Sequence, residues 1–139
     1  MPKLEEALFD YLSNDPGVSG LVGERIFPVR LPEKSIIPAI SWLRVSANRS
    51  YTYDTFADTD AWVQARIQFN CWDFTALGAM DVGEAVLKAL SGYEGDMSGQ
   101  LIGSSFSINE LDIYEAPTKF HRRILDFFIS YEDDLVVES

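Results

Sequence analysis

The sequence predicts an α+β fold, a single domain in which a mostly antiparallel sheet of about five strands carries two helices packed on one face. The expected order of elements is α-β-β-β-α-β-β. Two segments repeat apolar residues at helical spacing, one alternates apolar and polar residues, and two later segments carry apolar residues in strand phase. No repeat, low-complexity stretch or linker divides the 139 residues, so we expect one domain over 1–139.

The N-terminal third is expected to open with a helix over 3–12. Its apolar face is formed by Leu4, Leu8 and Leu12. The run Asn14-Asp15-Pro16-Gly17 should end this helix and begin a loop. A short strand is expected at 25–29, followed by a proline-rich connector and a second strand at 38–47 that is mostly buried on both faces.

The segment 61–72 is the most regular part of the chain. Its odd positions are all apolar: Ala61, Val63, Ala65, Ile67, Phe69 and Cys71. Its even positions place three amides and one charge between two tryptophans: Trp62, Gln64, Arg66, Gln68, Asn70 and Trp72. Because side chains alternate across a strand, we expect the odd face to pack under the helices and the even face to be a polar contact surface.

A second helix is predicted over 76–90, with Asp73 or Thr75 as the residue that caps its N-terminus. Its expected apolar stripe consists of Met80, Gly83, Val86, Leu87 and Leu90. An amphipathic helix of this kind covers one face of a sheet, so we place it beside the first helix.

Two long strands are expected to complete the sheet, at 101–114 and 119–132. In the first, the apolar phase changes after Ile108, which indicates a bulge. The second has apolar residues on both faces, so we expect it in the centre of the sheet. The acidic tail, 132–139, should fray.

The charge of the chain argues against several classes of function. The formal net charge is −11, from 22 acidic and 11 basic residues, which disfavours binding to nucleic-acid phosphates. The N-terminus lacks the apolar core of a signal peptide, and no apolar run is long enough to span a membrane. We therefore expect a protein that is made in the cytoplasm and has no membrane partner.

Residues that commonly carry catalysis or bind metals are scarce. Cys71 is the only cysteine and lies on the apolar face of its strand, so we expect it to be a buried apolar residue. His121 is the only histidine, and we expect it at the surface. The sequence therefore predicts no catalytic residues, no metal site and no cofactor.

Carboxylates are the only abundant titratable groups. One set lies in the polar loop expected at 48–60 and another on the strand expected at 101–114: Asp54, Asp58 and Asp60, then Glu110 and Asp112. We interpret them as a solvated acidic surface. The alternative is a small acidic enzyme or ligand-binding domain that uses a carboxylate pair, for which a closed pocket with one raised pKa would be the sign.

Three aromatic residues interrupt the same polar loop: Tyr51, Tyr53 and Phe56. Aromatic side chains are enriched at protein interfaces, so these residues could contact a partner. The equal alternative is that they fold back over an edge of the sheet.

The order of these motifs resembles the tail-completion and tail-terminator proteins of long-tailed bacteriophages. The likeness begins with a helix that ends in an Asp-Pro break, then continues with L-V-G-E-R-I-F-P at 21–28 and P-A-I-S-W at 38–42. It continues with R-I-Q-F-N-C-W-D at 66–73, which opens into a helix, and with R-R-I-L-D-F-F-I-S-Y at 122–131. The resemblance covers nearly the whole chain.

The resemblance implies a structural virion protein with no catalytic residues. Such a subunit forms a hexameric ring at the head-proximal end of the tail tube, stops tube polymerisation and receives the head connector. The implied partners are further copies of the chain, the tail-tube protein and the head connector or adaptor protein, while DNA passes through without specific binding. Another head–tail connector component remains open as an alternative.

The resemblance also changes the meaning of the polar strand face. Gln64, Arg66 and Gln68 are then expected to meet a neighbouring subunit or the channel rather than open water. The acidic residues of the loop and of the strand at 101–114 become candidates for an acidic lumen, which would repel passing DNA.

Overall fold

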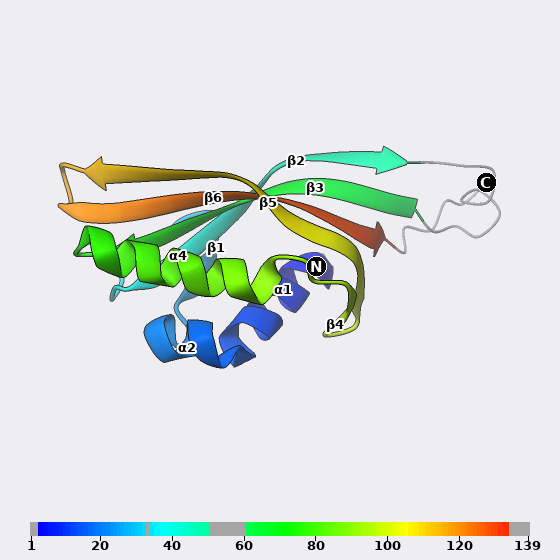
Figure 1. The fold of residues 1–139 in the computed structure, drawn as a ribbon, viewed down its shortest axis with the longest axis horizontal. Helices are drawn as coiled ribbons and strands as arrows, with labels where there is room; N and C mark the ends of the chain where they lie inside the picture. Colours follow the sequence, from blue (N-terminus) through cyan, green and yellow to red (C-terminus); the bar gives the residue numbers. More distant parts are fainter. Residues whose placement is uncertain (1–2, 33, 51–60, 134–139) are drawn as a thin grey trace.

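The computed structural model describes residues 3–32, 34–50 and 61–133. Its elements follow one another as shown in Figure 1. In chain order they are α1 (Lys3–Asn14), α2 (Pro16–Val22), β1 (Ile26–Pro28), β2 (Ala39–Ser50), β3 (Ala61–Asp73), α4 (Ala76–Leu90), β4 (Gly95–Met97), β5 (Gln100–Glu115) and β6 (Phe120–Asp133).

The strands form one six-stranded sheet in the order β1-β2-β3-β6-β5-β4. β1 runs parallel to β2, and all the other neighbours are antiparallel. β3 and β6 pair along their whole length, from Ala61 opposite Asp133 to Asp73 opposite His121. The predicted α+β fold with a mostly antiparallel sheet is therefore confirmed, and so is the central position of the last long strand.

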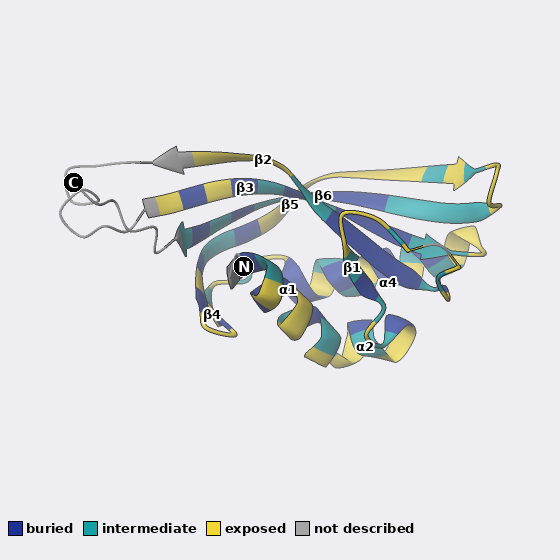
Figure 2. Cartoon of the chain, turned by 180° about the vertical axis from the view of Figure 1, so that it is seen from behind, coloured by how far each residue is buried: buried dark blue, intermediate teal, exposed yellow. Residues whose placement is uncertain are grey.

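The three helices of the described residues lie on one side of the sheet, and the core fills the space between the two layers (Figures 1 and 2). The apolar face of α1 is fully buried, as predicted, at Leu4, Leu8 and Leu12. Tyr11 joins α1 to α4, because its hydroxyl donates a hydrogen bond to the carbonyl oxygen of Ala89 at 2.7 Å. The opposite face of the sheet has no helix among the described residues.

The odd face of β3 packs into this core, as its alternation predicts. Val63, Ala65, Ile67, Phe69 and Cys71 are each 0% exposed. They meet the in-phase residues of β6 and the apolar residues of α4. A strand whose odd residues are all buried against helices cannot shift its register by one residue without exposing the whole set.

The predicted bounds of α4 agree with the structure. Thr75 is the N-cap, and its side-chain oxygen accepts a hydrogen bond from the backbone N–H of Gly78 at 3.0 Å. The buried face differs in part from the predicted stripe, because Met80 and Leu87 are only half-buried. The residues that are buried are Ala79, Val82, Gly83, Val86, Ala89 and Leu90.

The prediction of two helices was wrong, because α2 occupies the segment expected to be a loop. Asp15 caps this helix by accepting a hydrogen bond from the N–H of Val18 at 3.1 Å, and Pro16 fits its first turn. Val18 and Val22 are buried in the core. Tertiary burial therefore outweighs the two glycines that disfavour a helix here.

The prediction of about five strands missed β4, a three-residue strand that pairs with the start of β5. β5 itself contains two register shifts, between Ile102 and Ser104 and between Ser107 and Asn109. The second is the predicted bulge. The first was not predicted, and it places Ile102 and Phe106 on opposite faces of the sheet.

Strand β2 is less buried than expected. Ile40 and Trp42 are buried, but Val45 is 44% exposed and lies at a register shift between Arg44 and Ser46. Beyond that shift the described side chains of β2 are exposed, so only its first half contributes to the core.

Candidate interaction surfaces

The helix-free face of the sheet carries a polar cluster across β3 and β6. Asp126 of β6 is only 4% exposed. Its carboxylate accepts hydrogen bonds from Arg66 Nη2 at 3.2 Å and from Gln68 Nε2 at 3.4 Å. Two of the residues predicted to face a partner therefore also bind a buried carboxylate in their own sheet: Arg66 balances its charge and Gln68 donates a further hydrogen bond.

On the same face, the side chains near the end of β3 are less exposed to solvent. Asn70, expected on the polar surface, is only 4% exposed, and its Oδ1 has no hydrogen-bond partner among the described residues. Trp72 donates from Nε1 to the hydroxyl of Ser41 at 3.1 Å, and the Arg122 guanidinium lies over its ring. At the other end of β3, Gln64 is exposed. The contact of this face with a neighbour or a channel stays a prediction.

Glu110 and Asp112 are exposed on β5, on the face of the sheet that carries the helices, since their partners Leu125 and Arg123 lie opposite Phe69 and Cys71 of the core face. Arg123 Nε and Nη2 donate to the two carboxylate oxygens of Asp112 at 2.8 and 3.0 Å. This hydrogen bonding lowers the pKa of Asp112. A carboxylate held in its charged form is the opposite of the proton donor that a carboxylate-pair enzyme requires.

Six of the predicted site residues lie outside the described residues. They are the aromatic residues Tyr51, Tyr53 and Phe56 and the acidic residues Asp54, Asp58 and Asp60. Their assignment to an interface or an acidic lumen stays a prediction.

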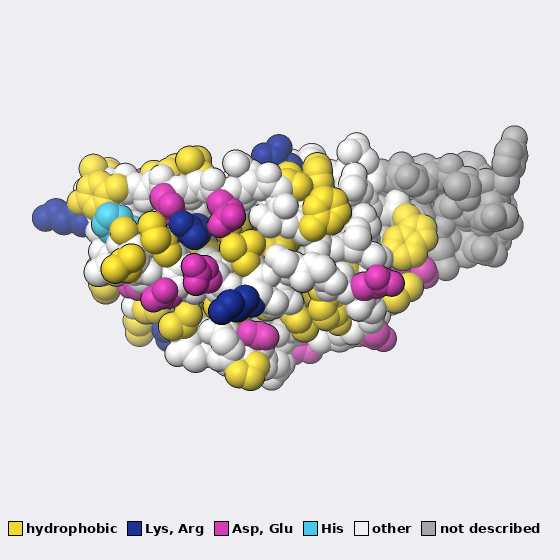
Figure 3. Space-filling model, viewed as in Figure 1, with side chains coloured by type: hydrophobic (Ala, Val, Ile, Leu, Met, Phe, Trp, Pro, Cys, Tyr) yellow, Lys and Arg dark blue, Asp and Glu magenta, His cyan; other side chains and the backbone are white. Residues whose placement is uncertain are grey.

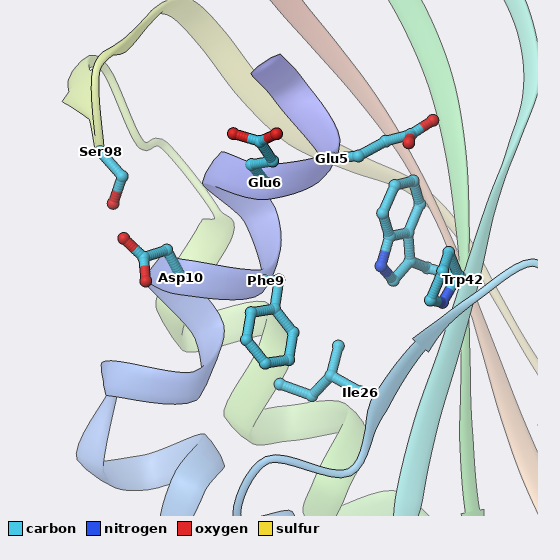
Figure 4. Close-up of a pocket in the computed structure, with 8 residues that line it drawn as sticks. Glu5, Glu6, Phe9, Asp10, Ile26, Trp42 and Ser98 are labelled. Atoms are coloured by element: carbon cyan, nitrogen blue, oxygen red, sulfur yellow. The ribbon is translucent and has the colours of Figure 1, made fainter. Parts of the chain in front are cut away.

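A groove with a volume of about 530 Å³ lies between α1 and the edge of the sheet (Figure 4). Phe9, Ile26 and Trp42 provide apolar walls. Three carboxylates of α1 and Ser98 of the β4–β5 turn provide the polar part: Glu5, Glu6 and Asp10. The sequence pattern did not reveal this groove, because its residues come from four separate segments of the chain.

The carboxylates of this groove all come from one helix, and Figure 4 shows them on the α1 side, with Ser98 on a separate segment. A glycosidase requires two carboxylates on opposite sides of its substrate. This groove instead has its carboxylates on one side, over an apolar floor.

The remaining chemistry within the described residues is sparse. No group of three or more metal-ligating side chains occurs there, and no helix of the described chain is long and apolar enough to cross a membrane. Cys71 is buried, and burial raises its pKa to about 12, so its thiol stays protonated and unreactive at neutral pH. His121 is half-buried and packs at a tilt against Tyr114.

Comparison with known proteins gives the family. Residues 6–132 match the family described as tail completion protein gp17. The fold is similar to a chain of the solved structure titled "Virion of native gene transfer agent (GTA) particle", with a TM-score of 0.72 and 17% identity over 94% of this chain and 95% of that chain. No curated protein sequence matches. The chain therefore belongs to the tail completion protein gp17 family, and its role is structural, in the tail of a phage virion.

Proposed function

We propose that this protein forms a ring at the head-proximal end of a phage tail, where it ends tube polymerisation and joins the tail to the head. The observation that carries the proposal is the family match, which spans residues 6–132 and hence almost every element of the fold. The similarity in fold to a chain of a virion particle supports the same setting.

The proposed partners are five further copies of the chain, the tail-tube protein and the head connector. A ring of six subunits would carry a formal charge of −66, six times −11. This field repels nucleic-acid phosphates, so DNA could pass through the ring without being held. A structural subunit of this kind needs no cofactor and no catalytic group.

A second candidate is another head–tail connector or adaptor component of similar size. The two proposals differ in the partner that the subunit meets first, the tube protein or the portal side of the connector. The carboxylate-pair enzyme is a weaker candidate, because the carboxylates of the groove all lie on α1.

The test is negative-stain electron microscopy of the purified protein mixed with tail tubes. We expect a ring at one end of each tube and tubes that stop growing when the protein is added to polymerising tube subunits. Tubes that grow equally well with and without the protein, and that show no density at either end, would contradict the proposal. Binding to the portal side alone would favour the adaptor.

The segment 51–60, predicted to belong to a polar loop, gives a mutational test of the predicted interface. Tyr51→Ala combined with Tyr53→Ala should leave the thermal unfolding of the monomer unchanged and reduce ring formation on tubes. Leu77→Ala is the matched control, since Leu77 is 74% exposed on α4, far along the chain from this loop. A large loss of monomer stability would instead mean that the two tyrosines fold back over the sheet.

A further inference from the structure

The sheet has two open edges, one on each side. At one side β1 pairs only with Ile40, Ser41 and Trp42 of β2, so the outer side of β2 over 43–50 meets no strand within the described chain. At the other side β4 pairs only with the first residues of β5. Since the N–H of Gly92 donates to the carbonyl of Ser105 at 2.7 Å, the open part of β5 covers 106–115.

The open part of β5 is unusually apolar for an exposed edge. Figure 2 shows the second half of this strand mostly exposed, and Figure 3 shows hydrophobic side chains at the end of the molecule where β5 and β6 meet. The large exposed apolar residues of this part are Phe106 (44%), Ile108 (39%), Leu111 (50%) and Tyr114 (53%). Proteins normally shorten, charge or cover such an edge, because it pairs readily with another strand.

The two open edges also differ in charge. β2 contains Arg44 and Arg49 and no acidic residue, whereas β5 contains Glu110, Asp112 and Glu115 and no basic residue. Within the subunit all three pair with arginines of β6: Arg122 with Glu115, and Arg123 with both Asp112 and, at 3.6 Å, Glu110. Three carboxylates thus share two arginines, and the Glu110 side chain is 48% exposed. The remaining charge on β5 favours a basic strand as its neighbour.

The directions of the two edge strands allow them to pair as an antiparallel ladder. From β2 through β3 and β6 to β5, each strand is antiparallel to the one before it, so β2 and β5 run in opposite directions. The two open parts lie toward opposite ends of the sheet, because Leu43 and Asn109 are at the same level, opposite Gln68 and Asp126. A rotation about an axis inclined to the strands moves a second copy to the side of the first, offsets it along the strands and does not reverse their direction. The β2 edge of the second copy then lies antiparallel to the β5 edge of the first.

We propose that neighbouring copies of this chain join edge to edge, with β5 of one subunit paired antiparallel to β2 of the next. This inference rests on the ring proposed above and identifies its subunit contact. The contact is head-to-tail, so it repeats until the rotation closes. It satisfies the open backbone groups of both edges and covers the apolar side chains of β5.

One consequence is that the sheets of all subunits become a continuous wall. Every helix then lies on one side of that wall, and the helix-free faces with Gln64 and the Asp126 cluster lie on the other. The two faces of the ring are therefore chemically different without any further rearrangement of the subunit.

Cysteine pairs can test the contact directly. The only native thiol, Cys71, is fully buried, so it does not compete for a disulfide. Double variants place one cysteine between 43 and 50 and the other between 106 and 115, starting with Ser46→Cys or Asn48→Cys combined with Ser107→Cys, Asn109→Cys or Leu111→Cys. Rings assembled on tubes are oxidised and separated on denaturing gels.

In an antiparallel ladder, moving one residue forward on one strand moves one residue back on its partner. The two residue numbers of every facing pair therefore have the same sum. Among pairs that lie beyond the register shifts of both strands, we expect cross-linked multimers only from those that share one such sum. Ser46→Cys with Leu111→Cys should thus behave like Asn48→Cys with Asn109→Cys, whether both cross-link or neither does. Cross-links that follow no constant sum would overturn the inference.

The cross-linking result tests the edge contact separately from the proposed ring. Rings visible on tubes without any cross-link across the scanned edges would reject the edge contact and leave the ring intact. Failure to form rings with the unmodified chain would reject the proposed function itself, and the edge contact with it.

A charge placed on the edge gives an independent test. Ile108→Lys should reduce ring formation at least tenfold while the monomer unfolds at the same temperature, because lysine on an edge opposes strand pairing. Leu77→Lys, which places the same charge on exposed α4, should assemble normally. Equal assembly of the two variants would also overturn the inference.

Discussion

Phe69 and Phe127 meet edge to face in the centre of the core, with ring centroids 5.6 Å apart. Both are 0% exposed. Removing the ring of Phe69 eliminates this contact and leaves a cavity between β3 and β6. We expect Phe69→Ala to lower the free energy of unfolding by roughly 3–5 kcal/mol, measured by urea denaturation.

The matched control for this substitution is Leu77→Ala on α4. Leu77 is 74% exposed, so its truncation should change the free energy of unfolding by no more than about 0.5 kcal/mol. Equal effects of the two substitutions would mean that the odd face of β3 is not the core.

The pair of Asp112 and Arg123 gives a pH dependence whose sign follows from the lowered pKa. The Arg123 hydrogen bonds hold the pKa of Asp112 below its ordinary value of 3.8 in the folded chain. The unfolded chain therefore takes up this proton first, and the stabilisation is complete above pH 3.8 and is lost as the pH falls through the folded pKa.

The measurement is the difference in melting temperature between the wild type and Asp112→Asn across this range. The wild type should be the more stable at pH 6, and the difference should shrink below pH 3.8. Asp81→Asn, an exposed carboxylate on α4, controls for the loss of one surface charge. A difference that grows on acidification would contradict the assignment.

At the scale of elements, a single glycine sets how closely α4 approaches β6. A Cβ atom at Gly83 would lie 2.6 Å from Cδ of Arg123, so no larger side chain fits without moving that arginine. We expect Gly83→Ala to lower the free energy of unfolding by about 1–3 kcal/mol, despite the better helix propensity of alanine.

Gly20→Ala in α2 is the matched helical control. A Cβ atom there meets nothing within 4 Å. The substitution should therefore raise the free energy of unfolding by about 0.4–1 kcal/mol, because it restricts the unfolded chain. If both variants gain stability, the close approach of α4 to β6 is not a constraint.

The elements that sequence reasoning could predict are those with many periodic residues. β3 alternates over its whole length, and α4 has a capping threonine and a long apolar stripe. α2 and β4 are short, so their few residues give no period. α2 has a local signal in Asp15 and Pro16, which is also the signal for the end of a helix.

The candidate surfaces were less predictable than the elements. The polar face of β3 follows from its own alternation, but the partner of Arg66 and Gln68 is Asp126, sixty or so positions later. The groove combines α1, β1, β2 and the β4–β5 turn. Contacts between distant segments depend on the tertiary arrangement, which no local pattern contains.

At the scale of the whole molecule, charge opposes assembly. Each subunit carries a net charge of −11, so copies repel one another at low ionic strength, where screening is weak. We expect the oligomer fraction on tube ends to rise as sodium chloride increases from about 0.01 to about 0.15 M, where the screening length falls from about 30 to about 8 Å. Light scattering or microscopy measures it, and a steady fall would mean that the attraction between the basic β2 edge and the acidic β5 edge outweighs the net repulsion.

The position of β6 in the sheet has a consequence for synthesis. β6 separates β3 from β5 in the sheet, yet it follows both in the chain. Until residues 120–133 have left the ribosome, the buried face of β3 lacks its neighbour, and β5 has no strand that ties it to the rest of the sheet. A prematurely terminated chain therefore cannot complete its fold, and only a finished subunit presents both edges at the correct separation.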